Sequence, residues 1–549
     1  MIPTFRVLLG LTACMLIAAC GGGSGKPATA ILTPPPSPPP SSTPPPVGTD
    51  VLTYKNDLSR SGQNLSESTL NPVNVNSSSF GLLRNMPVDG KVDAQLLYVS
   101  QLSISGSAHN TVFAATENDS VYAFDADNTA VLWQVSLLGT GETLSDARGC
   151  DQVTPEIGIT STPVIDRGAG AHGMIFVVAM SKDTSSNYHQ RLHALDLTTG
   201  AEMLNGPVEI AATYPAAGGG STAFSAGQYE ERAALLLLNG TIYTSWTSHC
   251  DIAPYYGWII AYAEDTLSRT AVLNVAPNSG GAGPAIWMSG GVPAVDAAGN
   301  IYLLTANGVF ETTLDANGFP TAQDYGNSFL KISTAGASLA VADYFTMFNE
   351  VAESNADEDL GSGGEMLLPD LTDSTGTVRH LVIGAGKDGN IYLVNRDSMG
   401  KFNASGNSQI WQEVSGALPG GIWSTPAYFN QTVYYADSGG TLKAFAISSA
   451  KLATAPQGQT ATQFPYPGTA PSVSANGTLN AIVWAHENSN PAVLHAYTAN
   501  LATELYNSNQ AAGNRDHFGA GNKFITPTVA DGMVFVGTTS SVAVFGLLQ

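Results

Sequence analysis

Short apolar runs alternate with polar turns along almost the whole chain after residue 50. The stretch 111–135 (TVFAATENDSVYAFDADNTAVLWQV) holds a first run, VFAAT, the polar turn ENDS, a second run, VYAFD, and a third run that ends in Trp133. Short runs rich in β-branched and aromatic residues, bounded by turn residues, are typical of β-strands. The pattern therefore predicts a meander of short antiparallel strands.

The second run of this unit recurs through the chain. We count eight copies, on average about 60 residues apart: Val121–Asp125, Leu192–Asp196, Ile259–Tyr262, Phe329–Ile332, Ile391–Asn395, Leu442–Phe445, Leu494–Tyr497 and Val542–Phe545. A repeat of this length with about four short strands is typical of a β-propeller, whereas a β-helix has shorter and more regular repeats. The sequence therefore predicts an all-β fold, a single propeller of eight four-stranded antiparallel blades over residues 50–549.

The two ends of the repeat region indicate how the ring closes. The last unit, Ile525 to Leu548, holds only the inner strands of a blade. The segment Phe80–Leu83 (FGLL) resembles the missing outer strand. Pairing this segment with the last unit would remove an open sheet edge, so we expect an N-terminal strand to close the ring.

The N-terminus has the pattern of an export signal. Arg6 precedes the apolar run Val7–Ala19, whose 13 residues are too few to span a bilayer but match the apolar region of a signal peptide. The end of the run, LIAAC, resembles the lipobox of bacterial lipoproteins, in which the Cys is lipidated and becomes the first residue. An ordinary secretory signal is the alternative. We therefore predict a lipoprotein signal peptide at 1–19 and lipidation at Cys20.

A linker follows the predicted lipidation site. Residues 20–49 begin with GGGSG and continue as a Pro-, Ser- and Thr-rich tract. Such tracts favour polyproline II and form no core. No later stretch of about 20 apolar residues is present, so lipid is the only membrane anchor that we expect. We predict an exported protein on the outer membrane, at its periplasmic or surface face.

The charge of the chain excludes one class of partner. The 549 residues carry 44 acidic and 21 basic side chains, a net charge of −23. A protein this acidic has no means of binding nucleic acid phosphates. Its 43% hydrophobic content is too high for general disorder.

The four cysteines divide into two pairs by position. Cys14 lies in the signal peptide and Cys20 is the lipidation site, which leaves Cys150 and Cys250. We expect these two to form a disulfide in an oxidising compartment. Their spacing matches no zinc motif, and the chain has no haem-attachment CxxCH.

Several repeats resemble a known superfamily. The phrases VYAFDADNTAVLW, LHALDLTTG and GKDGNIYLVNR are similar to repeats of the pyrroloquinoline quinone (PQQ) β-propeller superfamily. This superfamily includes quinoprotein alcohol dehydrogenases and the propeller subunit of the outer-membrane barrel-assembly machinery. The resemblance covers most of residues 50–549 and implies an eight-bladed fold. It implies little about activity, because function lies in sites carried on the fold.

The resemblance also implies a set of site residues. In the dehydrogenases Ca²⁺ is held by PQQ oxygens, a Glu and an Asn, an Asp is the general base, an Arg or Lys contacts the quinone, and a Trp stacks on it. The matching segments here are SHCDIAPYYGWIIAY, IYLLTANGVFE, ADEDLGSGGEMLL, GAGKDGNIYL, AIWMSGG and GGIWSTPAY. They imply metal ligands at Asp251 and Asn307, a base at Asp359 or Asp357, and cofactor contacts from Lys387, Trp287 and Trp423.

This chain departs from the dehydrogenase pattern in three ways. It has no adjacent Cys pair, Asp251 replaces the Glu with a register shift of about a residue, and no haem segment is present. Each implied residue also has a purely structural interpretation. Asn307-Gly308 and Asp388-Gly389 are good turn pairs, 357–359 fits a solvated acidic loop, and both Trp residues fit packing between blades.

Three functions remain open at this point. The leading hypothesis is a membrane-anchored lipoprotein whose propeller binds a protein partner or a small polar ligand on its axial face. The first alternative is a dehydrogenase for an alcohol or sugar that depends on PQQ and Ca²⁺. The second alternative, by analogy of fold, is a scaffold subunit in outer-membrane protein assembly.

Overall fold

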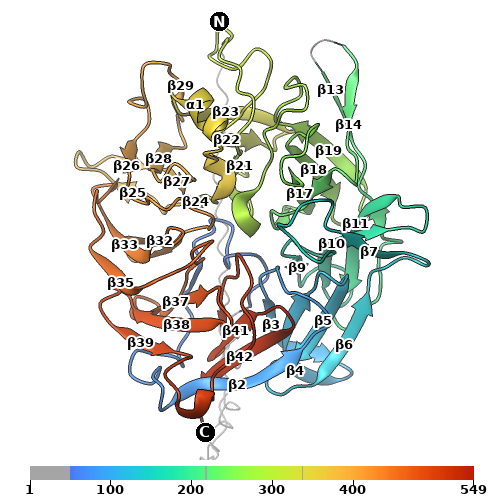
Figure 1. The fold of residues 1–549 in the computed structure, drawn as a ribbon, viewed down its shortest axis with the longest axis vertical. Helices are drawn as coiled ribbons and strands as arrows, with labels where there is room; N and C mark the ends of the chain where they lie inside the picture. The colour runs from blue at the N-terminus through green and yellow to red at the C-terminus, as the bar shows by residue number, and fades with distance from the viewer. Residues whose placement is uncertain (1–49, 217–218, 337) are drawn as a thin grey trace, which may run out of the picture. The chain divides into compact units, whose positions relative to one another are not determined.

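The computed structural model describes residues 50–216, 219–336 and 338–549. The predicted signal peptide (1–19), Cys20 and the linker (20–49) lie outside the described residues. Within them the chain forms eight mainly antiparallel sheets of four to six strands arranged in a ring (Figure 1), and two separate two-stranded hairpins. The helices are α1 (Glu350–Ala356) and the 3₁₀ turns η1 (Met288–Gly290), η2 (Leu360–Ser362) and η3 (Ala512–Asn514). The predicted eight-bladed all-β fold is thus confirmed.

The first three blades follow one another along the chain. Blade 1 consists of β3 (Leu97–Ile104), β4 (Ser107–Ala115), β5 (Ser120–Asp125) and β6 (Val131–Ser136). Blade 2 consists of β9 (Val164–Asp166), β10 (Met174–Lys182), β11 (Tyr188–Asp196) and β12 (Val208–Glu209), with β7 (Thr143–Asp146) and β8 (Glu156–Ile157) beside β10. Blade 3 consists of β15 (Tyr229–Glu230), β16 (Leu236–Leu238), β17 (Thr241–Ser248), β18 (Trp258–Ala263) and β19 (Arg269–Asn274). The hairpin β13 (Thr213–Pro215) and β14 (Ser221–Ala223) lies between blades 2 and 3 in the sequence.

Blades 4 to 6 come next, and blade 4 takes one extra, parallel strand from a later part of the chain. Blade 4 consists of β20 (Ala294–Val295), β21 (Ile301–Leu304), β22 (Ser328–Ser333), β23 (Ala340–Thr346) and β29 (Lys401–Phe402). Blade 5 consists of β24 (Met366–Leu367), β27 (Leu381–Ala385), β28 (Ile391–Asn395) and β30 (Gln412–Val414), with the small hairpin β25 (Leu371–Thr372) and β26 (Val378–Arg379). Blade 6 consists of β31 (Ala427–Phe429), β32 (Thr432–Ala436), β33 (Thr441–Ser448), β34 (Lys451–Leu452) and β35 (Gly458–Gln463).

The last two blades both include strands from the N-terminal part of the chain. Blade 7 consists of β36 (Ser472–Asn476), β37 (Leu479–Glu487), β38 (Val493–Thr498) and β39 (Glu504–Asn507), with β1 (Gln63–Asn64) paired to β36. Blade 8 consists of β40 (Thr528–Ala530), β41 (Met533–Gly537), β42 (Ser541–Leu547) and β2 (Phe80–Pro87). The eight repeated runs of the sequence are the strands β5, β11, β18, β22, β28, β33, β38 and β42.

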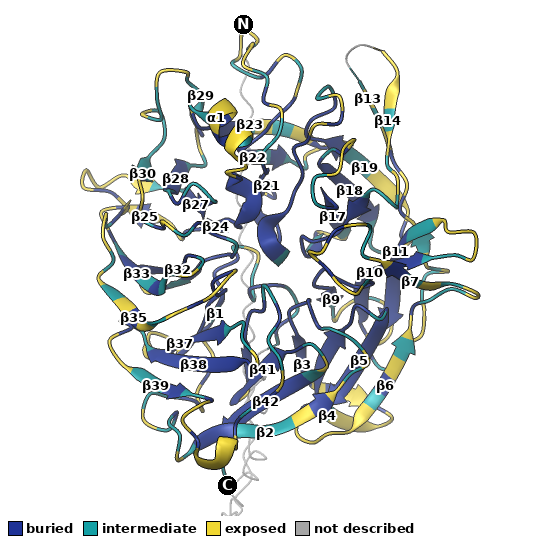
Figure 2. Ribbon diagram, viewed as in Figure 1, coloured by how far each residue is buried: buried dark blue, intermediate teal, exposed yellow. Residues whose placement is uncertain are grey.

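Strand β2 closes the ring as predicted. It pairs antiparallel with β42, from Phe80 opposite Leu547 to Pro87 opposite Ser541. Phe80 is fully buried, with its ring 5.0 Å from that of Tyr506 and 5.5 Å from that of Trp484. The apolar core is divided into layers, with one buried cluster at each of the eight blade interfaces, including the interface of blades 8 and 1. Figure 2 shows inner strands buried and exposed residues on outer strands and loops.

The segment 50–64 links the blades around the axis, which the sequence pattern did not predict. Its backbone, or in one case a side chain, hydrogen-bonds the innermost strand of seven of the eight blades. The pairs are Val51–Tyr98, Leu52–Ile165, Leu58–Val295, Ser59–Leu367, Ser61–Tyr428, Gly62–Val473 and Asn64–Val529. Because this single segment hydrogen-bonds seven blades, it connects the innermost strands of their sheets.

The fully buried side chains of Lys55 and Arg60 add further hydrogen bonds between this segment and the blades. The Nζ of Lys55 donates to the carbonyl oxygens of Pro426 and Pro471. The guanidinium of Arg60 donates to the carbonyl of Pro293, from Nε at 3.1 Å and from Nη2 at 2.9 Å. Burial lowers the pKa of Lys55 to about 7. These prolines lie just before innermost strands, so both side chains hold the entry points of blades.

No helix among the described residues has the length and apolarity needed to cross a membrane.

Candidate functional site

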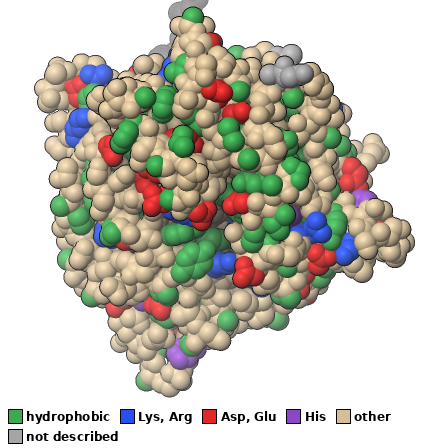
Figure 3. Space-filling model, turned by 45° about the horizontal axis from the view of Figure 1, so that its top comes forward, with side chains coloured by type: hydrophobic (Ala, Val, Ile, Leu, Met, Phe, Trp, Pro, Cys, Tyr) green, Lys and Arg blue, Asp and Glu red, His purple; other side chains and the backbone are tan. Residues whose placement is uncertain are grey.

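A pocket of about 360 Å³ lies on the axis of the ring. Its lining residues come from loops of blades 2 to 8: Gln152, Arg232, Cys250, Asp251, Trp287, Ser289, Asp357, Asp359, Ser362, Lys387, Trp423, Tyr466 and Phe524. Seven blades contribute to one cavity only where their inner loops converge, which is at the axis. In Figure 3 one face is hollowed near its middle, and apolar, acidic and basic side chains lie close together there.

The predicted site residues come together at this pocket. Six of the seven line it, namely Asp251, Trp287, Asp357, Asp359, Lys387 and Trp423. The seventh, Asn307, lies beside it and donates from Nδ2 to Oδ1 of Asp357 at 2.8 Å and from its backbone N–H to Oδ1 of Asp359 at 2.8 Å. Loops of blades 3 to 6 thus bring these seven residues together, and the roles that the resemblance implies for them stay predictions.

Lys387 forms ion pairs with the two carboxylates at the centre of the site. Its Nζ lies 2.6 Å from Oδ2 of Asp359 and 3.0 Å from Oδ2 of Asp357. The Asp359 side chain is 6% exposed and that of Lys387 19%. Burial raises the pKa of Asp359 to about 6, although Lys387 opposes the shift. Burial disfavours the charged form of Lys387, but the two aspartates raise its pKa above the usual value.

Aromatic rings form the other walls of the pocket. Trp423 meets Tyr466 edge to face with ring centres 5.5 Å apart. The guanidinium of Arg232 lies over the ring of Phe524, 4.4 Å from its centre. Trp287 is 9% exposed and contributes a further ring. The pocket therefore combines flat apolar surfaces with two cationic groups, those of Arg232 and Lys387.

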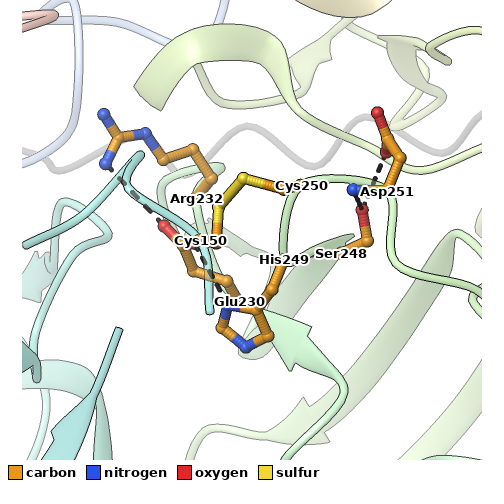
Figure 4. The surroundings of a disulfide bond; sticks show 7 residues. All are labelled: Cys150, Glu230, Arg232, Ser248, His249, Cys250 and Asp251. Atoms are coloured by element: carbon orange, nitrogen blue, oxygen red, sulfur yellow. Dashed lines mark hydrogen bonds and ion pairs between the residues drawn. A yellow bond between two sulfur atoms is a disulfide. The ribbon is translucent and has the colours of Figure 1, made fainter. Parts of the chain in front are cut away.

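The predicted disulfide between Cys150 and Cys250 is confirmed (Figure 4), and its Cys250 lines the pocket. It joins the loop between β7 and β8 of blade 2 to the loop after β17 of blade 3. The next residue, Asp251, is held by Ser248, whose hydroxyl donates to Oδ1 at 2.8 Å and accepts the Asp251 backbone N–H at 3.0 Å. The disulfide and this turn together fix one acidic residue at the pocket edge.

Three buried polar residues, Glu230, Arg232 and His249, lie near the disulfide. Glu230 is 3.8 Å from the Nη1 of Arg232 and 3.7 Å from the Nδ1 of His249 (Figure 4). Burial lowers the pKa of His249 to about 4, so this imidazole is neutral at physiological pH. Burial raises the pKa of Glu230 to about 7, against the effect of Arg232. Arg232 also lies 3.6 Å from Oδ1 of Asp93. Burial would raise the pKa of Asp93, but Arg232 and Lys91 hold it below its usual value. Both carboxylates lie beyond hydrogen-bond distance of Nη1 of Arg232.

Sequence reasoning missed Arg232, Tyr466 and Phe524. A weak signal existed for Phe524, because both Trp423 and Phe524 stand three residues before the Pro that precedes an innermost strand. Arg232 has no such signal, since its segment matches none of the compared motifs.

The residues present do not fit the calcium site that the resemblance implies. Ca²⁺ needs several free oxygen ligands. Here Asp359 and Asp357 are paired with Lys387, and Oδ1 of Asp251 accepts the hydroxyl of Ser248. In the described part of the chain no group of three His, Cys, Asp or Glu side chains is placed to hold a metal ion.

Comparisons with known proteins agree with the fold. No family model and no curated protein matches the sequence. Among solved structures, the quinohemoprotein alcohol dehydrogenase from Comamonas testosteroni matches with a TM-score of 0.59 and 14% identity, covering 91% of this chain and 80% of that chain. The quinohemoprotein alcohol dehydrogenase ADHIIG from Pseudomonas putida HK5 matches with a TM-score of 0.58 and 13% identity over the same shares.

BamB from Moraxella catarrhalis is more distant, with a TM-score of 0.46 and 12% identity over 85% of this chain and 99% of that chain. This match carries no argument about assembly of membrane proteins, so the scaffold hypothesis stays a prediction. At the identities of the dehydrogenases, likeness shows the fold and not the activity. The protein is an eight-bladed β-propeller with the fold of the quinohemoprotein alcohol dehydrogenases.

Proposed function

We propose that the axial pocket binds a planar, anionic aromatic molecule, with PQQ as the first candidate. The observation that carries this proposal is the combination of aromatic walls with Arg232 and Lys387 in one cavity. PQQ is a flat quinone that bears carboxylate groups. The pocket volume of about 360 Å³ lies within the usual range for small-molecule sites.

Arg232 is the best placed residue to recognise a carboxylate. Its side chain is 5% exposed, and its Nη1 has no hydrogen-bond partner among the described residues. The nearest carboxylate oxygens, of Asp93 and Glu230, are 3.6 Å and 3.8 Å away. A planar guanidinium pairs with a carboxylate through two parallel hydrogen bonds. A ligand carboxylate would hydrogen-bond the guanidinium, which Asp93 and Glu230 are too far away to do.

A titration with PQQ in calcium-free buffer tests this function. We expect quinone absorbance to stay with the protein after desalting, and Arg232→Leu to weaken binding about tenfold to a hundredfold because a charged hydrogen bond is lost. Arg84→Leu, a change of the same type on β2 away from the pocket, is the control. Loss of all quinone on desalting, or equal binding by both variants, would contradict the proposal.

A second candidate is a quinone-dependent dehydrogenase, which Asp359 favours. A bound quinone would supply the acceptor of two electrons. Asp359 is ionised above its pKa of about 6 and is held by Lys387, so it could accept the hydroxyl proton of an alcohol. The loaded protein with an alcohol and an acceptor dye separates the two candidates. Turnover that Asp359→Asn abolishes favours the enzyme, and binding without turnover favours the ligand-binding protein.

We also propose that this domain is exported and anchored by lipid at the outer membrane. The apolar run Val7–Ala19 followed by Cys20 supports this proposal. Metabolic labelling with a fatty acid tests it, with native protein expected to incorporate label and Cys20→Ser to incorporate none. Equal labelling of the two proteins, or no label in either, would contradict lipidation at Cys20. A protein partner on the axial face stays a prediction without further support.

A further inference from the structure

A second pocket, of about 530 Å³, adjoins the axial one. It is bounded by the loops around Tyr255 in blade 3 and Asn307 in blade 4 and by helix α1. Its lining consists of Asp251, Ala253, Tyr255, Ala282, Asn307, Gly308, Val309, Phe310, Glu350, Val351, Ser354 and Asn355. Asp251 lines both pockets, so the two cavities share one wall residue.

The second pocket is acidic, in contrast to the axial one. Asp251 and Glu350 contribute two carboxyl groups, and no Lys, Arg or His is among the lining residues. The axial pocket has three acidic lining residues, but it also has two basic ones, Arg232 and Lys387. A cavity with carboxylates and no basic residue attracts cations.

Glu350 has a carboxyl oxygen without a partner inside the protein. The side chain is 1% exposed, and its Oε1 accepts the hydroxyl of Ser354 at 2.7 Å. The other oxygen, Oε2, is buried and has no hydrogen-bond partner among the described residues. Burial raises the pKa of Glu350 to about 7, and no cation offsets this rise. Because an unpaired buried acceptor is unfavourable, a donor from a ligand would be stabilising here.

Apolar and aromatic side chains complete the pocket. Tyr255 and Phe310 are 6% and 7% exposed, while Val309 and Val351 are 37% and 56% exposed at its edge. Burial, together with the nearby carboxylate of Asp251, raises the pKa of Tyr255, so its hydroxyl stays protonated. Aromatic faces also attract cations. The pocket therefore offers a carboxylate acceptor beside apolar surface.

We propose that this second pocket binds a small organic ammonium ion with an apolar substituent. The ammonium group donates to Oε2 of Glu350, and Asp251 adds negative potential from the shared wall. The substituent lies against Phe310 and the two valines. This inference goes beyond the proposed function, since it needs no quinone in the axial pocket.

The test compares benzylammonium with benzyl alcohol, which has nearly the same shape without the charge. Calorimetric titration of the full chain is done above the pKa of about 7 of Glu350, where its carboxylate is ionised. We expect benzylammonium to bind at least tenfold more tightly than the alcohol. Equal affinities, or no binding of benzylammonium at millimolar concentration, would overturn the proposal.

Variants locate the binding site. Glu350→Gln should lower the benzylammonium affinity at least tenfold and leave the alcohol unaffected, whereas Glu358→Gln, a change at an exposed residue outside the pocket lining, should alter neither. Val351→Arg places a cation at the exposed edge and should also abolish ammonium binding, without depending on the buried carboxyl. Unchanged ammonium affinity in both Glu350→Gln and Val351→Arg would overturn the proposal. PQQ retention, measured in the same variants, should not change, which separates this proposal from the function of the axial pocket.

Discussion

Replacing Lys387 with Met is expected to abolish binding of an anionic ligand and to lower the unfolding free energy by about 3 kcal/mol at neutral pH. The reason is that Asp359, with its side chain 6% exposed, would lose the ammonium group 2.6 Å away. Removing one member of a buried pair leaves an uncompensated charge, which is far less favourable than the intact pair. Urea denaturation and PQQ titration measure the two effects.

The loss of stability in Lys387→Met should depend on pH. The pKa of Asp359 is already raised from 3.8 to about 6 in the folded protein, and loss of Lys387 would raise it further. A carboxyl with a raised folded-state pKa is stabilising when protonated, and this contribution is lost as pH rises through the folded pKa. The variant should therefore approach native stability at a pH well below 6 and lose stability above it.

A double variant provides the control for this interpretation. In Lys387→Met with Asp359→Asn no carboxylate is left without its cation, so most of the lost stability should return at neutral pH. If the double variant is no more stable than Lys387→Met alone, then the pair does not explain the loss. If the single variant is equally unstable at all pH values, packing rather than charge is responsible.

The fold could be predicted from the sequence because each blade is a local structure. Runs such as Val121–Asp125 and Val542–Phe545 form the same strand of their blades, and neighbouring strands are joined by short turns. The closure of the ring by the strand that begins at Phe80 could be predicted because the last unit of the sequence lacks an outer strand. The segment 50–64 could not be predicted in this way. It acts through backbone groups and the buried side chains of Lys55 and Arg60, which leave no periodic pattern in the sequence.

The candidate site was predictable in part for a similar reason. Lys387 and Asp359 stand in short motifs that resemble known repeats, and the ring geometry brings such loops to the axis. The charge balance of the site was not predictable. Whether Asp359 is free to bind a metal or is paired with Lys387 depends on distances between loops, which no motif encodes. The same holds for the unpaired Oε2 of Glu350, since only three-dimensional packing determines whether an acceptor is buried.

Removal of the disulfide should have the largest effect on stability. Cys150 and Cys250 are 100 residues apart, and closing a loop of that length is worth roughly 4–5 kcal/mol on the chain-entropy model. We expect the double variant Cys150→Ala and Cys250→Ala to lose about that much unfolding free energy in urea, and to bind PQQ more weakly because Cys250 lines the pocket beside Asp251.

Native protein in a strong reductant should match the variant, and the variant should not respond to the reductant. Native stability in the variant would mean that packing of blades 2 and 3 holds these loops without the covalent bond. If the variant keeps native stability but binds PQQ weakly, then the disulfide shapes the pocket and does not stabilise the fold.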